Sequence, residues 1–186
     1  GTATAGEMQQ AMNQGCEVLK FFPAEANGGV AMLKNIGAAL KTAKWMCTGG
    51  ISAKNVNDYL GYDQIAAVGG TWMCKNDMIK AEKWAEITAM CKEAVKTMLG
   101  FELAHVGVNC ENEAEAEQTA KTLCALFGLD YKAGNSSIFA GKAVECMKKP
   151  GRGKNGHIAI GANNVDRAVY HLGRQGVEFI EESRVV

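Results

Sequence analysis

The sequence predicts an α/β protein made of two unlike parts, one on each side of Gly100. In residues 1–99, strand-like and helix-like segments alternate at a spacing of roughly 20 to 27 residues, which predicts parallel strands joined by helical crossovers. In residues 101–186, the elements follow the order βαββ and then βαβ, which predicts an α+β domain. The composition is that of a globular chain, since 47% of the 186 residues are hydrophobic and 22% are charged.

Turn and cap residues mark the elements of the first part. The predicted strands are residues 18–22, 45–47 and 65–68, and the predicted helices are residues 7–13, 30–42, 52–60 and 84–99. Gly15 follows the first helix as a C-terminal stop, and Ser52 has the position of an N-cap for the third. The last helix places apolar side chains on one side, as an amphipathic helix does.

Glycines also end the helices predicted in the second part. The predicted strands are residues 103–109, 137–140, 143–147, 157–161 and 177–180, and the predicted helices are residues 113–127 and 165–174. Gly128 and Gly176 follow the two helices. The segment His105-Val-Gly-Val-Asn is similar to His157-Ile-Ala-Ile-Gly, and each precedes a helix, so the second part contains a weak internal repeat.

Charge and cysteine usage exclude several classes of function. The 20 basic and 20 acidic residues balance, so nothing electrostatic indicates binding to nucleic acid or to an anionic membrane. No apolar run is long enough to span a bilayer. The 7 cysteines are odd in number, scattered and never in CxxC spacing, which indicates reduced thiols. We therefore predict a cytoplasmic protein that does not bind nucleic acid or a membrane.

A lysine within an apolar strand is the first candidate for chemistry. Lys20 lies in the run Val18-Leu19-Lys20-Phe21-Phe22-Pro23, where strand alternation gives it the same side as Val18 and Phe22. Apolar neighbours disfavour an ammonium and would lower the pKa of Lys20. A neutral amine attacks carbonyl carbons, which is Schiff-base chemistry. The alternative is a lysine near a strand end that extends its amine into water.

Two glycine pairs follow the next two strands. They are Thr48-Gly49-Gly50 and Gly69-Gly70-Thr71, and glycine allows backbone N–H groups to approach an anion closely. In (β/α)8 barrels the phosphate site commonly lies in the loops after strands 7 and 8, on the catalytic face. If the three strands are the last three of a barrel, Lys20 and both loops meet at one mouth. The alternative for each glycine pair is an ordinary turn.

These residues match a known family in order and spacing. The run from Lys20 to Gly29 resembles the Schiff-base strand of 2-keto-3-deoxy-6-phosphogluconate (KDPG) aldolase, a class I aldolase related to 4-hydroxy-2-oxoglutarate aldolase. The later matching segments are Thr48-Gly49-Gly50-Ile51-Ser52, Asn55, Tyr59-Leu60 and Gly69-Gly70-Thr71-Trp72. The resemblance covers residues 1 to about 98. Cys47 departs from the usual proline, and Thr71 departs from the usual serine.

The resemblance implies a fold, a reaction and roles for the site residues. The fold would be about three βα units from the C-terminal part of a (β/α)8 TIM barrel, a homotrimer when the barrel is complete. The reaction would cleave KDPG to pyruvate and glyceraldehyde 3-phosphate, or 4-hydroxy-2-oxoglutarate to pyruvate and glyoxylate, without a cofactor. Lys20 would form the imine, and Phe22 and Pro23 would wall the keto-acid pocket. The residues expected near the substrate carboxylate and phosphate are Thr48, Gly49, Gly50, Gly69, Gly70 and Thr71.

The resemblance also implies that part of the catalytic machinery is missing. The family's general acid/base glutamate comes from early barrel strands, and the sequence looks truncated at both ends. No residue here matches that glutamate, and Glu25 belongs to the strand-end motif. A nucleophile without a positioned proton shuttle loses about 10²–10⁴ in rate, so we expect the chain alone to be a poor aldolase.

The second part resembles the vicinal-oxygen-chelate (glyoxalase-like) superfamily. That superfamily pairs βαβββ modules around a divalent metal, and His105, Glu145 and His157 match three of its ligands. Nitrogen and oxygen ligands suit zinc or nickel, and a fourth ligand would lie beyond Val186. The implied alternatives are a metal-dependent glyoxalase- or dioxygenase-like activity, or a ligand-binding or oligomerising domain without activity. The alternative for these three residues is that they are ordinary polar residues retained at strand ends.

Overall fold

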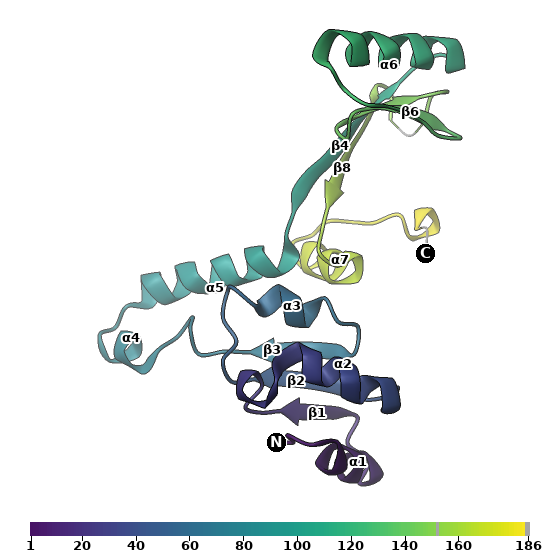
Figure 1. Ribbon diagram of the computed structural model, residues 1–186. Helices are drawn as coiled ribbons and strands as arrows, with labels where there is room; N and C mark the ends of the chain where they lie inside the picture. Colours follow the sequence, from purple (N-terminus) through teal and green to yellow (C-terminus); the bar gives the residue numbers. More distant parts are fainter. Residues whose placement is uncertain (152, 185–186) are drawn as a thin grey trace. The chain divides into compact units, whose positions relative to one another are not determined.

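The computed structural model describes residues 1–151 and 153–184, which form two compact units (Figure 1). The first unit contains Gly1–Gly100 and the described residues from Asn163 onward, and the second contains Phe101–Ala162. The predicted second domain, residues 101–186, therefore extends further toward the C-terminus than the observed second unit, which ends at Ala162. Arg152 and the last two residues of that predicted domain lie outside the described residues.

A three-stranded parallel sheet organises the first unit. Its strands are β1 (Val18–Phe21), β2 (Lys44–Thr48) and β3 (Ile65–Gly69), in the order β1-β2-β3. The helices are α1 (Ala5–Asn13), α2 (Gly29–Ala39), α3 (Val56–Leu60), α4 (Asn76–Lys80), α5 (Trp84–Leu99) and α7 (Val165–Gly173), with short 3-10 turns η1 (Glu25–Asn27) and η2 (Glu181–Ser183). The prediction of parallel strands joined by helices is confirmed.

The two faces of this sheet differ in burial. One face carries the core, in which Phe21, Trp45 and Cys47 are fully buried against helical residues such as Leu33 and Tyr59. The opposite side chains are open to solvent, as strand alternation requires. Val18 is 52% exposed and Met46 is 39% exposed. Lys20 is exposed with them, so the predicted apolar, desolvated surroundings of its amine are wrong for the described chain.

Several local predictions in the first unit are also wrong. Helix α3 begins at Val56 with Asn55 as its N-cap, and Ser52 instead accepts a hydrogen bond at its Oγ from the Lys54 N–H at 3.3 Å. Residues 177–180 form no strand. Alternating apolar residues produce a strand only where a neighbouring strand supplies hydrogen bonds, and Ile180 is 66% exposed. Helix α4 was not predicted because five residues give no measurable periodicity.

The second unit contains a five-stranded mixed sheet covered on one face by a helix. Its elements are β4 (Glu102–Asn109), α6 (Glu113–Phe127), β5 (Tyr131–Ala133), β6 (Ser137–Ala140), β7 (Val144–Met147) and β8 (Gly156–Gly161), with the sheet order β5-β6-β7-β4-β8. Strand β4 is parallel to β7 and antiparallel to β8. The observed order β4-α6-β5-β6-β7 contains the predicted βαββ series and adds strand β5, which was not predicted. Its relation to the glyoxalase-like superfamily stays a prediction.

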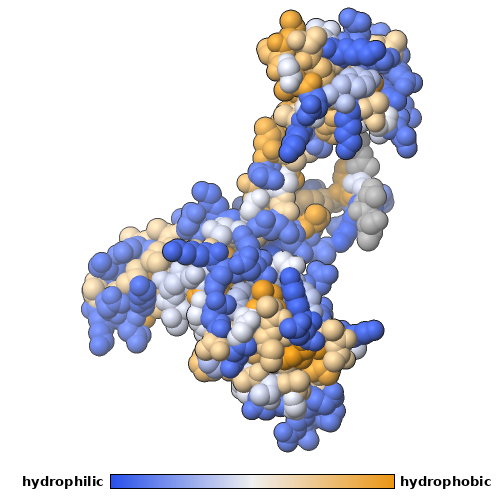
Figure 2. All heavy atoms as spheres, viewed as in Figure 1, coloured by the Kyte–Doolittle hydropathy of each residue, from blue (hydrophilic) through white to orange (hydrophobic). Residues whose placement is uncertain are grey.

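Helix α6 creates the core of the second unit and leaves the other sheet face free. Ala116 and Ala120 of α6 are fully buried against Ile138, Ala140 and Cys146. The side chains that alternate with these strand residues point to the opposite face. Apolar side chains remain exposed on both units (Figure 2), and across residues 1–151 and 153–184 no helix is long and apolar enough to span a membrane.

Candidate functional site

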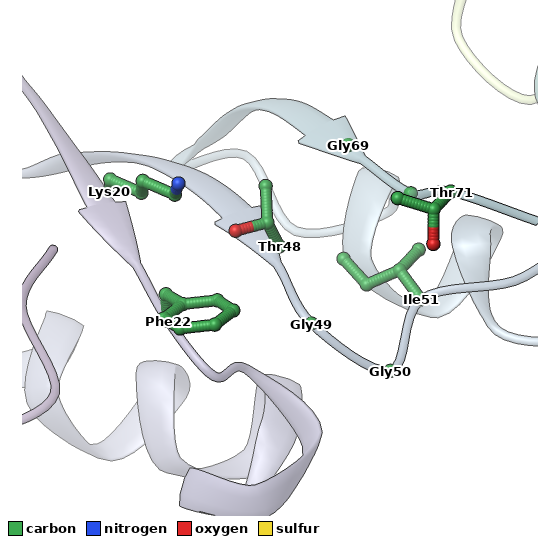
Figure 3. A pocket seen from close by; sticks show the side chains of 9 residues that line it. Lys20, Phe22, Thr48, Gly49, Gly50, Ile51, Gly69 and Thr71 are labelled. Atoms are coloured by element: carbon green, nitrogen blue, oxygen red, sulfur yellow. The ribbon is translucent and has the colours of Figure 1, made fainter. Parts of the chain in front are cut away.

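A cavity of ≈ 430 Å³ lies at the carboxyl ends of the three strands of the first unit (Figure 3). Its lining residues are Lys20, Phe22, Thr48, Gly49, Gly50, Ile51, Gly69, Gly70 and Thr71. The structure thus brings together every residue predicted for the aldolase site except Pro23, which does not line the cavity. Ile51 was missed as a lining residue, although it belongs to the segment that carries the resemblance.

Lys20, Phe22 and Thr48 lie around the same space (Figure 3). Lys20 and Phe22 point to one side because they are two residues apart, and the Lys20 Nζ is 5.3 Å from the centroid of the Phe22 ring. The Phe22 side chain is 51% exposed, so it offers an apolar wall that a ligand could cover. The amine is therefore accessible to a small molecule that enters the cavity.

The Thr48 hydroxyl is a polar group of a cavity-lining residue, and it is buried. Within the described part of the chain it has no hydrogen-bond partner. A buried polar group without a partner costs about 1–3 kcal/mol of stability. The hydroxyl thus has unused hydrogen-bonding capacity at the end of strand β2, next to the two glycines.

The loop after β2 requires glycine at two positions. Gly49 has a φ of 97° and Gly50 a φ of 81°, which side chains other than glycine rarely adopt. A Cβ on Gly49 would lie 3.0 Å from the Pro23 Cα. Among residues 1–151 and 153–184, Gly49, Gly50, Gly70 and Thr71 donate no backbone–backbone hydrogen bond. Their N–H groups are therefore free to bind an anion.

The turn after β1 is held against the loop after β2 by its backbone. The Ala24 N–H donates to the Thr48 carbonyl at 2.8 Å, and the Glu25 N–H donates to the Gly49 carbonyl at 3.1 Å. These bonds fix the lysine strand and the glycine loop relative to each other. Pro23 lies in this turn, after a cis Phe22–Pro23 peptide bond.

Side chains from α3 and its N-cap complete the support of the two loops. The Tyr59 hydroxyl donates to the Glu25 Oε1, and the Asn55 Nδ2 donates to the Gly50 carbonyl at 3.2 Å. Burial and the neighbouring Glu25 carboxylate raise the pKa of Tyr59, so the hydroxyl keeps its proton and remains a donor. Glu25 therefore supports the loop.

The second unit brings His105, Glu145 and His157 together on the sheet face opposite α6. They come from β4, β7 and β8, and their side chains are 25%, 14% and 36% exposed. The Glu145 Oε2 lies 3.1 Å from the Nε2 of each histidine, and the two Nε2 atoms are 3.1 Å apart. Three ligand atoms thus form a triangle with nearly equal sides.

Hydrogen bonds alone cannot satisfy all three sides of this triangle. If both histidines carry a proton on Nε2 and donate it to Glu145, their two N–H groups also face each other. If instead one histidine donates its Nε2 proton to the Nε2 of the other, the accepting histidine has no proton on Nε2 to donate to the Glu145 carboxylate. A cation removes the conflict, because three lone pairs can point at it. Atoms that bind one zinc ion at about 2.0–2.1 Å lie roughly 3.0–3.4 Å from each other, so the three residues fit a divalent metal.

Two residues that sequence reasoning missed support this cluster. The Ser137 hydroxyl, on a residue 5% exposed, donates to the Glu145 Oε1 at 2.5 Å and leaves Oε2 for the histidines. The Phe139 ring contacts the His105 ring edge-on, with centroids 5.4 Å apart. Neither residue belongs to a motif, and only the register of β6 against β7 places them beside Glu145.

Comparison with known proteins supports the resemblance of the first unit to aldolases. Residues 1–90 match the family model described as KDPG and KHG aldolase. The chain is 41% identical over 95 residues to 2-dehydro-3-deoxy-phosphogluconate aldolase of Dickeya dadantii, covering 51% of this chain and 45% of the relative. It is 38% identical over 96 residues to KHG/KDPG aldolase of Escherichia coli, covering 52% and 45%.

Solved structures of aldolases are also similar to about half of this chain. The KDPG aldolase of Legionella pneumophila, crystallised with pyruvate as a covalent carbinolamine intermediate, is 39% identical, covers 48% of this chain and 44% of that chain, and gives a TM-score of 0.47. The chain spans about half the length of the curated relatives it matches, 45% for the two named above.

Proposed function

We propose that the first unit carries the imine-forming part of a class I aldolase site, with Lys20 as the nucleophile. The observation that supports this most strongly is the single cavity lined by Lys20, Phe22 and both glycine loops, within a stretch similar to KDPG and KHG aldolases. The proposed substrates are KDPG and 4-hydroxy-2-oxoglutarate, which share a 2-keto acid end. The glycine loops favour the phosphorylated substrate, because they offer N–H donors and no carboxylate.

The proposed chemistry uses the amine as nucleophile and then as an electron sink. The neutral Lys20 amine attacks the keto carbon to give a carbinolamine, which takes up a proton from water and loses water to give the protonated imine. Cleavage of the C3–C4 bond sends its electron pair into the imine and releases the aldehyde, as the C4 hydroxyl loses its proton. The resulting enamine takes a proton at C3, and water then releases pyruvate. The Thr48 hydroxyl would bind the substrate carboxylate, and the N–H groups near Gly50 and Thr71 would bind the phosphate.

The described residues provide no carboxylate to move the C4 proton. No aspartate or glutamate lines the cavity in the part of the chain that the structure describes. A missing general base lowers the rate by about 10²–10⁴. We therefore expect this chain to form the pyruvate imine much more readily than it cleaves KDPG.

Borohydride trapping with pyruvate tests the proposal. Incubation followed by reduction and peptide mass spectrometry is expected to give a reduced pyruvate adduct on Lys20. Lys20→Met should abolish it, whereas Lys41→Met, at an exposed lysine outside the cavity, should leave it unchanged. Absence of the adduct in a chain that is folded by circular dichroism, or an adduct spread over other lysines, would overturn the assignment.

The ligand triangle of the second unit supports a second proposed function, a divalent metal centre. His105, Glu145 and His157 would hold the ion, and zinc or nickel suits this donor set. When bound, the ion would supply Lewis-acid chemistry for a glyoxalase- or dioxygenase-like reaction. The alternative is a domain that binds a ligand without turnover.

Metal analysis separates these possibilities. Dialysed protein should retain about one zinc or nickel per chain, and the double variant His105→Ala, His157→Ala should lose it. His171→Ala is the matched control, because it removes the third histidine of the sequence, which lies on α7. Equal metal content in the double variant and the wild type would reject the centre. The homotrimer and the cytoplasmic location remain predictions.

A further inference from the structure

Gly107 has no side chain that could bind a metal, yet it lies at the middle of the proposed metal centre. In the register of the sheet it pairs with Glu145 on β7 and with His157 on β8. His105 is two residues earlier on β4 and so points to the same face. Gly107 therefore lies between Glu145 and His157 across the sheet. Along its own strand, one of its nearest neighbours on the same face is the third ligand, His105.

The imidazole of His157 occupies the space where a side chain at position 107 would be. A Cβ built on Gly107 would come well under 3.0 Å from three atoms of that ring, Cε1, Nδ1 and Nε2. Gly107 is buried, although both neighbours in the strand, Val106 and Val108, are 38% and 40% exposed. The ring thus lies directly over the backbone of β4.

Backbone conformation does not explain a glycine at this position. Gly107 is not among the glycines with a positive φ, so its backbone accepts other residues. Glycine inside a strand lowers stability by roughly 0.5–1 kcal/mol relative to alanine, and it often marks a site of close approach. The close approach here is that of His157.

The spacing of the strands shows why the missing side chain at position 107 matters for the ligands. Neighbouring strands lie about 4.7–4.9 Å apart, so residues on β7 and β8 are separated by roughly twice that distance with β4 between them. Glu145 and His157 nevertheless place Oε2 and Nε2 at 3.1 Å. Both side chains lean over β4, and a side chain at position 107 would stand between them.

We propose that Gly107 is the positioning residue that allows the three ligands to converge, and that any larger residue there prevents a single ion from contacting all three. This inference rests on the metal centre proposed above. Gly107→Ala is expected to turn the His157 ring away from Glu145, because a ring is easier to rotate than the sheet is to distort. The fold should persist, since the backbone conformation suits alanine.

The test compares Gly107→Ala with Gly161→Ala. Gly161 lies in β8 of the same sheet, and a Cβ there would lie 3.1 Å from the Cγ of the flexible Glu102 side chain. Isothermal titration with Zn²⁺ and with Ni²⁺ should show affinity lowered about 10–100-fold or more in Gly107→Ala, and unchanged in Gly161→Ala. Both variants should keep the wild-type circular dichroism spectrum.

A second measurement needs no metal. In the metal-free wild type the rings of His105 and His157 are in edge-on contact, with centroids 5.2 Å apart, which predicts a nuclear Overhauser effect between them. Gly107→Ala should abolish that signal. Unchanged metal affinity in Gly107→Ala would overturn the inference, whether or not the signal is retained. A wild type that binds neither metal, but whose ring contact is lost in Gly107→Ala, would reject the metal centre and show only that Gly107 sets the position of the His157 ring.

Discussion

Replacement of Thr48 by valine should make the first unit more stable and its cavity less able to bind a keto acid. Valine has nearly the shape of threonine and suits the end of strand β2. The substitution removes a buried hydroxyl that has no partner in the described chain and places a methyl group there. Stability and ligand binding are therefore expected to change in opposite directions.

The size of both effects follows from the surroundings of the hydroxyl. An unpartnered buried polar group costs about 1–3 kcal/mol, and valine removes this group while nearly keeping the shape of the side chain. We expect a gain of about 1 kcal/mol in the free energy of unfolding. A hydrogen bond to a carboxylate contributes about 1.5–3 kcal/mol, so pyruvate should bind roughly 10–100-fold more weakly.

Urea unfolding followed by tryptophan fluorescence measures the first effect. All three tryptophans, Trp45, Trp72 and Trp84, belong to the first unit, so the signal reports that unit. The concentration dependence of borohydride trapping measures the second effect. Thr48→Ser keeps the hydroxyl and should trap pyruvate as the wild type does. Thr71→Val is the control for stability: because Thr71 is exposed, the free energy of unfolding should change by less than about 0.5 kcal/mol. A Thr48→Val variant that is less stable at unchanged m-value, and that traps pyruvate as well as the wild type, would refute the reasoning.

Two further predictions concern buried groups. Ser137→Ala removes the donor to the Glu145 Oε1 and should lower the affinity for zinc about 10–100-fold in a calorimetric titration. Ser136→Ala, at an exposed residue, is the control and should bind zinc as the wild type does. Equal zinc affinities of Ser137→Ala and the wild type would exclude an orienting role for Ser137. Burial raises the pKa of the Cys47 thiol from 9.0 to about 12, so the unfolded chain loses this proton first and stability should fall as pH rises from 9 to 12. Cys47→Ala should show a shallower fall in unfolding free energy over that range, by at most about 1.4 kcal/mol per pH unit, and parallel curves would contradict the prediction.

Much of the fold could be predicted because its signals are local. The helices Trp84–Leu99 and Glu113–Phe127 have the predicted bounds, since each combines a long apolar period with a glycine stop in the left-handed region. The features that were wrong or missed depend on partners distant in sequence. Residues 177–180 have the composition of a strand, but no neighbouring strand pairs with them in the described chain. Lys20 lies on the predicted side of its strand, yet its burial depends on what covers that face.

In the candidate sites, too, some residues could be predicted from the sequence and others could not. Residues that bear reactive atoms, such as Lys20 and His105, could be selected from residue type and resemblance. Ser137 and Gly107 could not, because only the pairing register places them beside Glu145 and His157. A pattern along the chain contains no information about which residue lies across the sheet.

Glycine serves the two candidate sites for different physical reasons, and these reasons predict different costs of substitution. Gly49 adopts a φ of 97°, so alanine there should strain the backbone by about 1–2 kcal/mol and also meet the Pro23 Cα. Gly107 has no such conformation, so alanine there should displace the His157 ring at little or no cost in stability. Urea unfolding of the two variants should therefore show a loss for Gly49→Ala and none for Gly107→Ala, while each variant loses the ligand of its own unit. Equal destabilisation of both variants would mean that Gly107 is retained for the fold and not for the convergence of the ligands.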